Sequence, residues 1–165
     1  MRPIRAACLG AATLVTLLTC TSVAAGAATD TDSAQAGSKA RTITLRAEVK
    51  ELTRIPDTGG PVQGNRAIAR SDLSLFDDPT RTKIGESHVV CTTTRGGADE
   101  AEQCVATYVL PDGQLTVQGM YFDYLDQGPF DNAITGGTGK YEKARGSVHS
   151  DPVQPGVRRF TIHLV

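Results

Sequence analysis

Runs of β-branched, aromatic and other apolar residues recur along the chain from residue 42 onward, separated by stretches rich in Gly, Pro and Asp. In one such run, Leu115 and Val117 alternate with Thr116 and Gln118, which is the two-residue period of a strand with two different faces. No run in this part of the chain shows the 3.6-residue period of a long helix. The pattern predicts an all-β domain with strands near Thr42–Val49, Asp72–Phe76, Thr82–Thr93, Gln103–Leu110, Gln114–Tyr124, Phe130–Thr135, Ala144–Ser150 and Val157–Leu164.

The connections between these runs predict how the strands pair. Pro111-Asp112-Gly113 predicts a tight hairpin, because Asp-Gly readily supplies the positive φ that such a turn needs. Consecutive strands joined by short turns favour an eight-stranded antiparallel barrel over an open sandwich, because closure leaves no unpaired sheet edge. The exception is Lys50–Arg70, whose prolines and glycines predict a long loop of the kind that often forms a lid.

The first residues have the features of a targeting segment. Arg2 and Arg5 precede an uncharged run, and small residues follow up to Ala28, which is typical of a secretory signal peptide over residues 1–28. The apolar run is too short for a permanent membrane span. Residues 29–41 are small and polar and predict a disordered leader, which leaves residues 42–165 as the barrel domain. We therefore expect a secreted protein with no stable membrane insertion after cleavage.

Charge and composition narrow the range of partners. The 17 basic and 18 acidic residues give a formal net charge of -1, which does not favour nucleic-acid binding. The three histidines show no metal-binding spacing, and the nucleophile motif G-x-S-x-G is missing. The glycines of Gly136–Lys140 lack the spacing of a phosphate-binding loop and more simply permit a turn. The sequence therefore points to no metal and no cofactor.

The predicted signal peptide reduces the number of cysteines that can pair in the barrel domain from four to two. Of the four in the chain, Cys8 and Cys20 lie in the signal peptide, so Cys91 and Cys104 alone remain. They fall on consecutive predicted strands, and an exported protein meets an oxidising compartment, so a cross-strand disulfide is expected. The alternative is a reactive thiolate, for which His88 is the one basic neighbour in sequence.

Several motifs of the chain resemble the allene oxide cyclase and dirigent barrels. They are Asp112-Gly113, Leu115-Thr-Val-Gln-Gly-Met-Tyr121, Ala133-Ile-Thr-Gly-Gly-Thr-Gly-Lys-Tyr141, Gly146-Ser-Val148, Leu75-Phe76-Asp77 and Lys83-Ile84-Gly85 followed by Cys91. The resemblance covers about residues 46–165 and implies an eight-stranded antiparallel barrel, similar to a lipocalin, with an apolar cavity open at one end. Relatives of this kind steer ring closure of a fatty-acid epoxide or radical coupling of phenols, and positioning does much of the work.

The same resemblance implies site residues. The first-strand E-x-N motif of the plant cyclases corresponds to Glu48-Val49-Lys50, so Glu48 is the expected catalytic residue, with a surface carboxylate paired with Lys50 or Arg46 as the alternative. The remaining expected cavity residues are Asp72, Cys91, Tyr108, Tyr121 and Phe122.

Together these features predict a secreted barrel, a bacterial member of this group, that binds a small apolar or aromatic molecule. By resemblance it directs cyclisation, isomerisation or stereoselective coupling of that molecule, as an isomerase or cyclase does. The alternatives are a non-catalytic extracellular carrier and a structural surface protein without a ligand. We also expect that the barrel can form a homo-oligomer.

Overall fold

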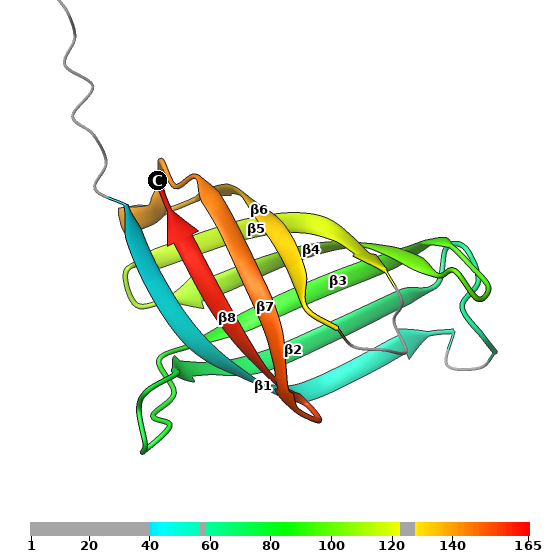
Figure 1. Cartoon of the computed structure of the whole chain (residues 1–165), viewed down its shortest axis with the longest axis horizontal. Coiled ribbons are helices and arrows are strands. Elements are labelled where there is room, and N and C mark those ends of the chain that lie inside the picture. Colours follow the sequence, from blue (N-terminus) through cyan, green and yellow to red (C-terminus); the bar gives the residue numbers. More distant parts are fainter. Residues whose placement is uncertain (1–39, 57–58, 123–127) are drawn as a thin grey trace, which may run out of the picture. The chain divides into compact units, whose positions relative to one another are not determined.

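The computed structural model describes residues 40–56, 59–122 and 128–165, which form strands and a single 3₁₀ turn (Figure 1). The strands and the turn are β1 (Arg41–Ile55), β2 (Arg66–Leu75), β3 (Gly85–Arg95), β4 (Ala101–Leu110), β5 (Gly113–Phe122), β6 (Phe130–Gly137), η1 (Gly139–Tyr141), β7 (Gly146–Gln154) and β8 (Val157–Leu164). Each strand is antiparallel to the next, and β1 also pairs with β8. The sheet therefore closes into the predicted barrel, in which no described strand is left with a free edge.

The hairpin between β4 and β5 is the one that the Asp-Gly motif predicted. Leu110 pairs with Gly113, so Pro111 and Asp112 alone make the turn. Gly113 has a φ of 140°, and a Cβ at this position would collide with the carbonyl oxygen of Thr138. Glycine is needed here both for the backbone conformation and for the close approach of the next connection.

The prediction of a long loop over Lys50–Arg70 is wrong, because strands occupy both ends of this segment. β1 continues to Ile55 after a bulge between Val49 and Glu51, and β2 begins at Arg66 rather than at Asp72. The inward positions of the new β2 segment carry small residues, so the sequence shows little hydrophobic alternation there. The true connection spans residues 56–65, and three of its backbone groups are bonded to the β3–β4 hairpin: Gly64 N to Thr93 O, Asn65 O to Thr93 N, and Pro61 O to Gly97 N.

Other predicted boundaries shift by a few residues. β1 begins at Arg41, β3 begins at Gly85 instead of Thr82, and β7 begins at Gly146 instead of Ala144. The predicted end of β5 at Tyr124 falls in residues 123–127, outside the described part. The predicted signal peptide at residues 1–28 and residues 29–39 of the predicted leader lie outside it as well. In the described ranges, no helix is long and apolar enough to cross a membrane.

The half of the barrel that contains the start of β1 and the end of β8 is filled by its own side chains. Leu45, Leu73, Leu115, Val148 and Ile162 are completely buried there and belong to one apolar cluster. Tyr141 of η1 belongs to the same cluster and closes this end. Burial of these large side chains stabilises this half of the barrel, which is called the packed base below.

A charged network lies on the outer face of β6, β7 and β8. The ring of His149 contacts Asp131 at 2.8 Å and Asp151 at 3.2 Å, and Arg159 bonds Asp151 at 2.8 Å. The hydrogen bond and charge of Asp131, reinforced by Asp151, raise the pKa of His149 above its usual value of 6.5. The protonated ring is therefore favoured in the folded protein.

This contact predicts a pH-dependent contribution to stability. The pKa of His149 is raised on folding, so the contribution is complete below about pH 6.5 and is lost as the pH rises through the folded pKa. In an NMR titration, Asp131→Asn should lower the pKa of His149 toward its usual value. The stability difference between the native protein and this variant should shrink at alkaline pH. A His149 pKa that is unchanged by the substitution would contradict the assignment.

Candidate functional site

The other half of the barrel contains a cavity of about 290 Å³. It lies toward the ends of β1 and β3, where the connections β1–β2 and β3–β4 are found. Most side chains that line it from β2, β3 and the middle of β4 are small, namely Ala67, Ala69, Ser71, Ser87 and Ala106, with Val89 among them. Large residues at these positions would fill the barrel, as they do at its base, so the space is a direct consequence of side-chain size along three neighbouring strands.

Two stacked aromatic rings form the boundary between the packed base and the cavity. Tyr108 and Phe160 lie with ring centroids 5.3 Å apart, and both belong to the buried cluster while lining the cavity. Burial raises the pKa of the Tyr108 hydroxyl, so this group stays protonated at ordinary pH. The floor of the cavity is therefore apolar and carries no charge.

The opposite wall carries an arginine held among aromatic rings. Arg158 lies over the ring of Phe130 at 4.6 Å, and Tyr121 meets the same ring edge-on at 4.6 Å. The guanidinium donates to Ser150 Oγ at 2.7 Å and to the carbonyl oxygen of Gly128 at 2.7 Å. Burial lowers the pKa of Arg158, although arginine remains charged at any ordinary pH. This wall thus fixes a positive charge beside apolar surface.

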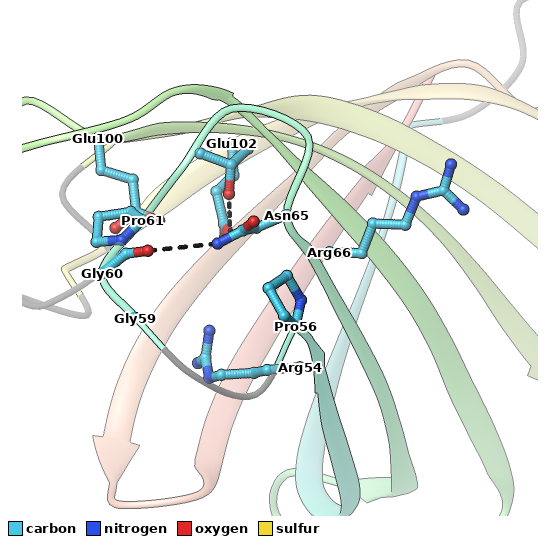
Figure 2. A pocket seen from close by; sticks show the side chains of 10 residues that line it. Arg54, Pro56, Gly59, Gly60, Pro61, Asn65, Arg66, Glu100 and Glu102 are labelled. Atoms are coloured by element: carbon cyan, nitrogen blue, oxygen red, sulfur yellow. Dashed lines mark hydrogen bonds between the residues drawn. The ribbon is translucent and has the colours of Figure 1, made fainter.

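A second pocket, of about 260 Å³, lies under the β1–β2 loop and shares lining residues with the open end of the cavity (Figure 2). Arg54 and Glu102 line both spaces. Figure 2 shows Glu100 and Glu102 reaching this pocket from one side and Arg54 from the other, while Asn65 donates to the carbonyl oxygen of Gly60. The mouth is therefore polar, in contrast to the floor.

Glu102 is a carboxylic acid removed from solvent. Its exposed fraction is 4%, and Thr93 Oγ1 lies 3.5 Å from its Oε1, at the outer limit of a hydrogen bond. Burial raises the pKa of Glu102, and the charge of Glu100 adds to this effect, whereas Arg54 opposes it. The group is thus closer to an acid–base transition at neutral pH than an exposed glutamate is.

The predicted disulfide between Cys91 and Cys104 is confirmed, and it forms part of the cavity wall. The two residues are register partners on β3 and β4. Their sulfur atoms and a carboxylate oxygen of Glu102 all lie within 4.8 Å of one another. The bond occupies both sulfurs, so neither is a thiolate nucleophile while it is intact.

One polar atom in the cavity wall has no partner in the protein. Ser87 is 1% exposed, and within the part of the chain that the structure describes its Oγ makes no hydrogen bond. A buried hydroxyl without a partner costs free energy, which a bound molecule with a hydrogen-bonding group would recover. Ser87 Oγ is therefore a polar group of the cavity wall that is available for a hydrogen bond.

The structure divides the residues that the sequence suggested for the cavity. Cys91, Tyr108 and Tyr121 line it, whereas Glu48, Asp72 and Phe122 do not. The reason is the alternation of side chains along each strand: these three residues neighbour inward-facing Ala47, Leu73 and Tyr121 and so occupy the outer face. The prediction that Glu48, Asp72 and Phe122 line the cavity is therefore corrected: they lie on the outside of the barrel.

The carboxylates of Glu48 and Asp72, on the outer face, form ion pairs with lysines. Glu48 is a register partner of Asp72 and accepts a hydrogen bond of 2.7 Å from Lys50, which is the alternative that the sequence left open. Asp72 contacts Lys83 at 2.8 Å. The hydrogen bond from Lys50 lowers the pKa of Glu48, and that from Lys83 lowers the pKa of Asp72. The catalytic role expected of Glu48 stays a prediction, with the cavity lying on the other face of its strand.

Several polar residues of the cavity are not among those that the sequence analysis expects: Arg54, Ser71, Ser87, Glu102, Asn132 and Arg158. Strand phase could have identified Glu102: Cys104, Ala106 and Tyr108 face inward, so the residue two places before Cys104 does as well. The predicted strand began at Gln103 and left it out. Arg54 lay in the segment interpreted as a loop, and the bulge before it changes which residues face inward.

Comparison with solved structures places the fold among known barrels. A pyocyanin demethylase is 22% identical, with a TM-score of 0.65 over 74% of this chain and 99% of its own. A pterocarpan synthase dirigent protein is 15% identical, with a TM-score of 0.60 over 76% of this chain and 84% of its own. An exo-specific intermolecular Diels–Alderase is 13% identical, with a TM-score of 0.62 over 76% of this chain and 97% of its own.

The fold is that of the dirigent and cyclase barrels. This confirms, for the fold, the resemblance that the sequence motifs indicated. No protein-family model matches the chain, and no curated protein matches it in sequence.

Proposed function

We propose that this dirigent-type barrel binds a small apolar or aromatic molecule and directs its cyclisation, isomerisation or coupling. The observation that carries the proposal is the half-empty interior, a cavity of about 290 Å³ with an apolar floor and a few polar groups. Concave, mostly apolar sites with convergent polar groups are the usual places for small ligands. The polar groups that would orient the molecule are Arg158, Glu102, Tyr121 and Ser87.

The confined shape supports a directing role. A flexible molecule held between the Tyr108–Phe160 floor and the Arg158 wall has few conformations to explore, which brings reacting atoms together and excludes water. Barrels with this fold include an exo-specific intermolecular Diels–Alderase, a cyclase that catalyses a [4 + 2] cycloaddition and a pterocarpan synthase dirigent protein. These names support the reaction class and leave the substrate open.

The two alternatives make different demands on the interior. A structural surface protein needs no empty space, so the cavity and the unpartnered Ser87 hydroxyl speak against this role. A carrier would use the same cavity but needs no acid–base group in it. The buried Glu102 therefore favours a catalyst over a carrier.

We further propose that the protein is secreted, through the signal peptide at residues 1–28. The Cys91–Cys104 disulfide supports this location, because disulfides persist in oxidising compartments. Homo-oligomer formation also stays a prediction, for which the outward, exposed and adjacent side chains of Ile68, Val90 and Val105 offer an apolar strip across β2, β3 and β4.

Filling the cavity should abolish ligand binding without unfolding the barrel. The double variant Ala69→Leu, Ala106→Leu adds two branched side chains to the small-residue wall. With 2-naphthol as a probe, calorimetry should show binding to the native protein and at least about a tenfold loss in the variant, equivalent to about 1.4 kcal/mol. The same probe should raise the thermal midpoint of the native protein alone.

The matched control is Val105→Leu, on the outer face of the strand that carries Ala106. It adds a leucine at a position that is 48% exposed and should leave 2-naphthol binding unchanged. Equal binding by the native protein and the filled variant would place the probe outside the cavity and contradict the proposal, as would the absence of binding to the native protein.

A further inference from the structure

The position of Glu102 sets it apart from the other acidic residues of the barrel wall. Its carboxyl group lines both the apolar cavity and the pocket at the mouth. It is 4% exposed, whereas the side chains of Glu48 and Glu86 on the outer face are 44% and 31% exposed. Glu100 is also buried, at 7% exposed, but it lines only the pocket at the mouth. Among the acidic residues that the structure describes, Glu102 is therefore the one that lines both spaces.

The surroundings of Glu102 provide little solvation for a negative charge. On the cavity side it meets the Cys91–Cys104 disulfide, and Thr93 Oγ1 approaches only to 3.5 Å. Burial and the nearby Glu100 both disfavour the ionised form. A carboxylate that is poorly solvated is a stronger base than one in water, and its protonated form is retained at higher pH as a proton donor.

The ionisable groups around Glu102 come from several elements of the barrel. Arg54 on β1 stabilises the carboxylate, and Glu100 before β4 destabilises it. Tyr121 on β5 is the register partner of Glu102. The other charged residues that line these spaces are Arg66 and Arg158, and Figure 2 shows the Arg66 side chain extending away from Glu102.

We propose that Glu102 is the general acid–base residue of the cavity, the group that removes a proton from the bound molecule or delivers one to it. This inference rests on the proposed function, because it assumes that the substrate occupies the cavity. A cyclisation or isomerisation commonly requires one proton to leave a carbon or oxygen atom and another to arrive, and one carboxyl group can perform both steps in turn.

A probe reaction can test this role without knowledge of the natural substrate. In the elimination of 5-nitrobenzisoxazole, the Glu102 carboxylate would take the proton from C3. The C–H electron pair then completes the nitrile triple bond while the N–O bond breaks, and the oxygen leaves as a phenolate. The proton remains on Glu102 until water at the mouth accepts it, so atoms and charge balance without a further reactant.

The native protein should accelerate this elimination, and Glu102→Gln should lower kcat/KM by about 100-fold. The rate should rise with pH as Glu102 loses its proton, with a midpoint above 4.5, the ordinary pKa of a glutamate. Glu102→Asp should retain a pH-dependent but slower reaction. Glu86→Gln, on the outer face, should behave as the native protein.

The outcomes separate this inference from the proposed function. If 2-naphthol binds in the cavity but Glu102→Gln eliminates 5-nitrobenzisoxazole as fast as the native protein, the role of Glu102 is wrong and the binding site stands. A loss with Glu48→Gln but not with Glu102→Gln would likewise overturn it in favour of Glu48. Thermal unfolding of Glu102→Gln checks folding, and it should be no less stable, because the substitution removes a buried charge.

Discussion

Replacing Phe160 by alanine should lower the free energy of unfolding by about 3 kcal/mol, the lower end of the range for a buried aromatic residue. Phe160 is 7% exposed and stacks on Tyr108 between the packed base and the cavity. Its removal would merge the cavity with a void among buried leucines and isoleucines. The loss stays at the lower end because one side of the ring already borders open space.

Urea unfolding of the native protein and of Phe160→Ala measures this effect, which should appear as a lower midpoint with an unchanged slope. Phe122→Ala is the matched control, since this aromatic side chain is 61% exposed on the outer face. It should change the free energy of unfolding by no more than about 0.5 kcal/mol. Equal losses in the two variants would mean that the Tyr108–Phe160 floor does not support the barrel.

Removing the disulfide should cost a similar amount by a different mechanism. Cys91 and Cys104 are 13 residues apart in the sequence, and their bond restricts the unfolded chain. Loop-closure entropy for a segment of this length predicts that Cys91→Ala, Cys104→Ala lowers the free energy of unfolding by about 3 kcal/mol. The fold itself should persist, because the two residues are also joined through the hydrogen-bonded ladder of β3 and β4.

Thermal unfolding with and without a thiol reductant provides the control. The reductant should lower the midpoint of the native protein toward that of the double variant and should leave the variant unchanged. If the variant unfolds at the same temperature as the oxidised native protein, the disulfide contributes no stability. The cavity wall also contains this bond, so 2-naphthol binding to the double variant reports whether the wall keeps its shape without it.

The two carboxylates Glu48 and Glu102 show what a strand pattern reveals and where it fails. Both belong to predicted or nearly predicted strands, and both carry the same chemistry. The resemblance of a short motif points to Glu48, yet its neighbours Ala47 and Val49 face inward and turn it outward. Glu102 was one residue beyond a predicted boundary, and its inward direction depends on the phase set by Cys104, Ala106 and Tyr108.

The sequence by itself determined the all-β class, the eight strands of the barrel, the Asp-Gly hairpin and the pairing of Cys91 with Cys104. These features follow from local alternation, from turn residues and from the two cysteines that lie beyond the predicted signal peptide, all of which can be read from the sequence.

Only the tertiary structure decided where the barrel is empty and which polar groups face that space. The cavity arises because small side chains on β2, β3 and β4 become neighbours across the sheet. This arrangement depends on the register between strands, so the sequence of any one strand does not reveal it. The bulge after Val49 directs Arg54 inward, and the β1–β2 loop packs over Glu100 and Glu102. Closure of the barrel thus converts residues scattered over the chain into one site with an apolar floor and a polar mouth.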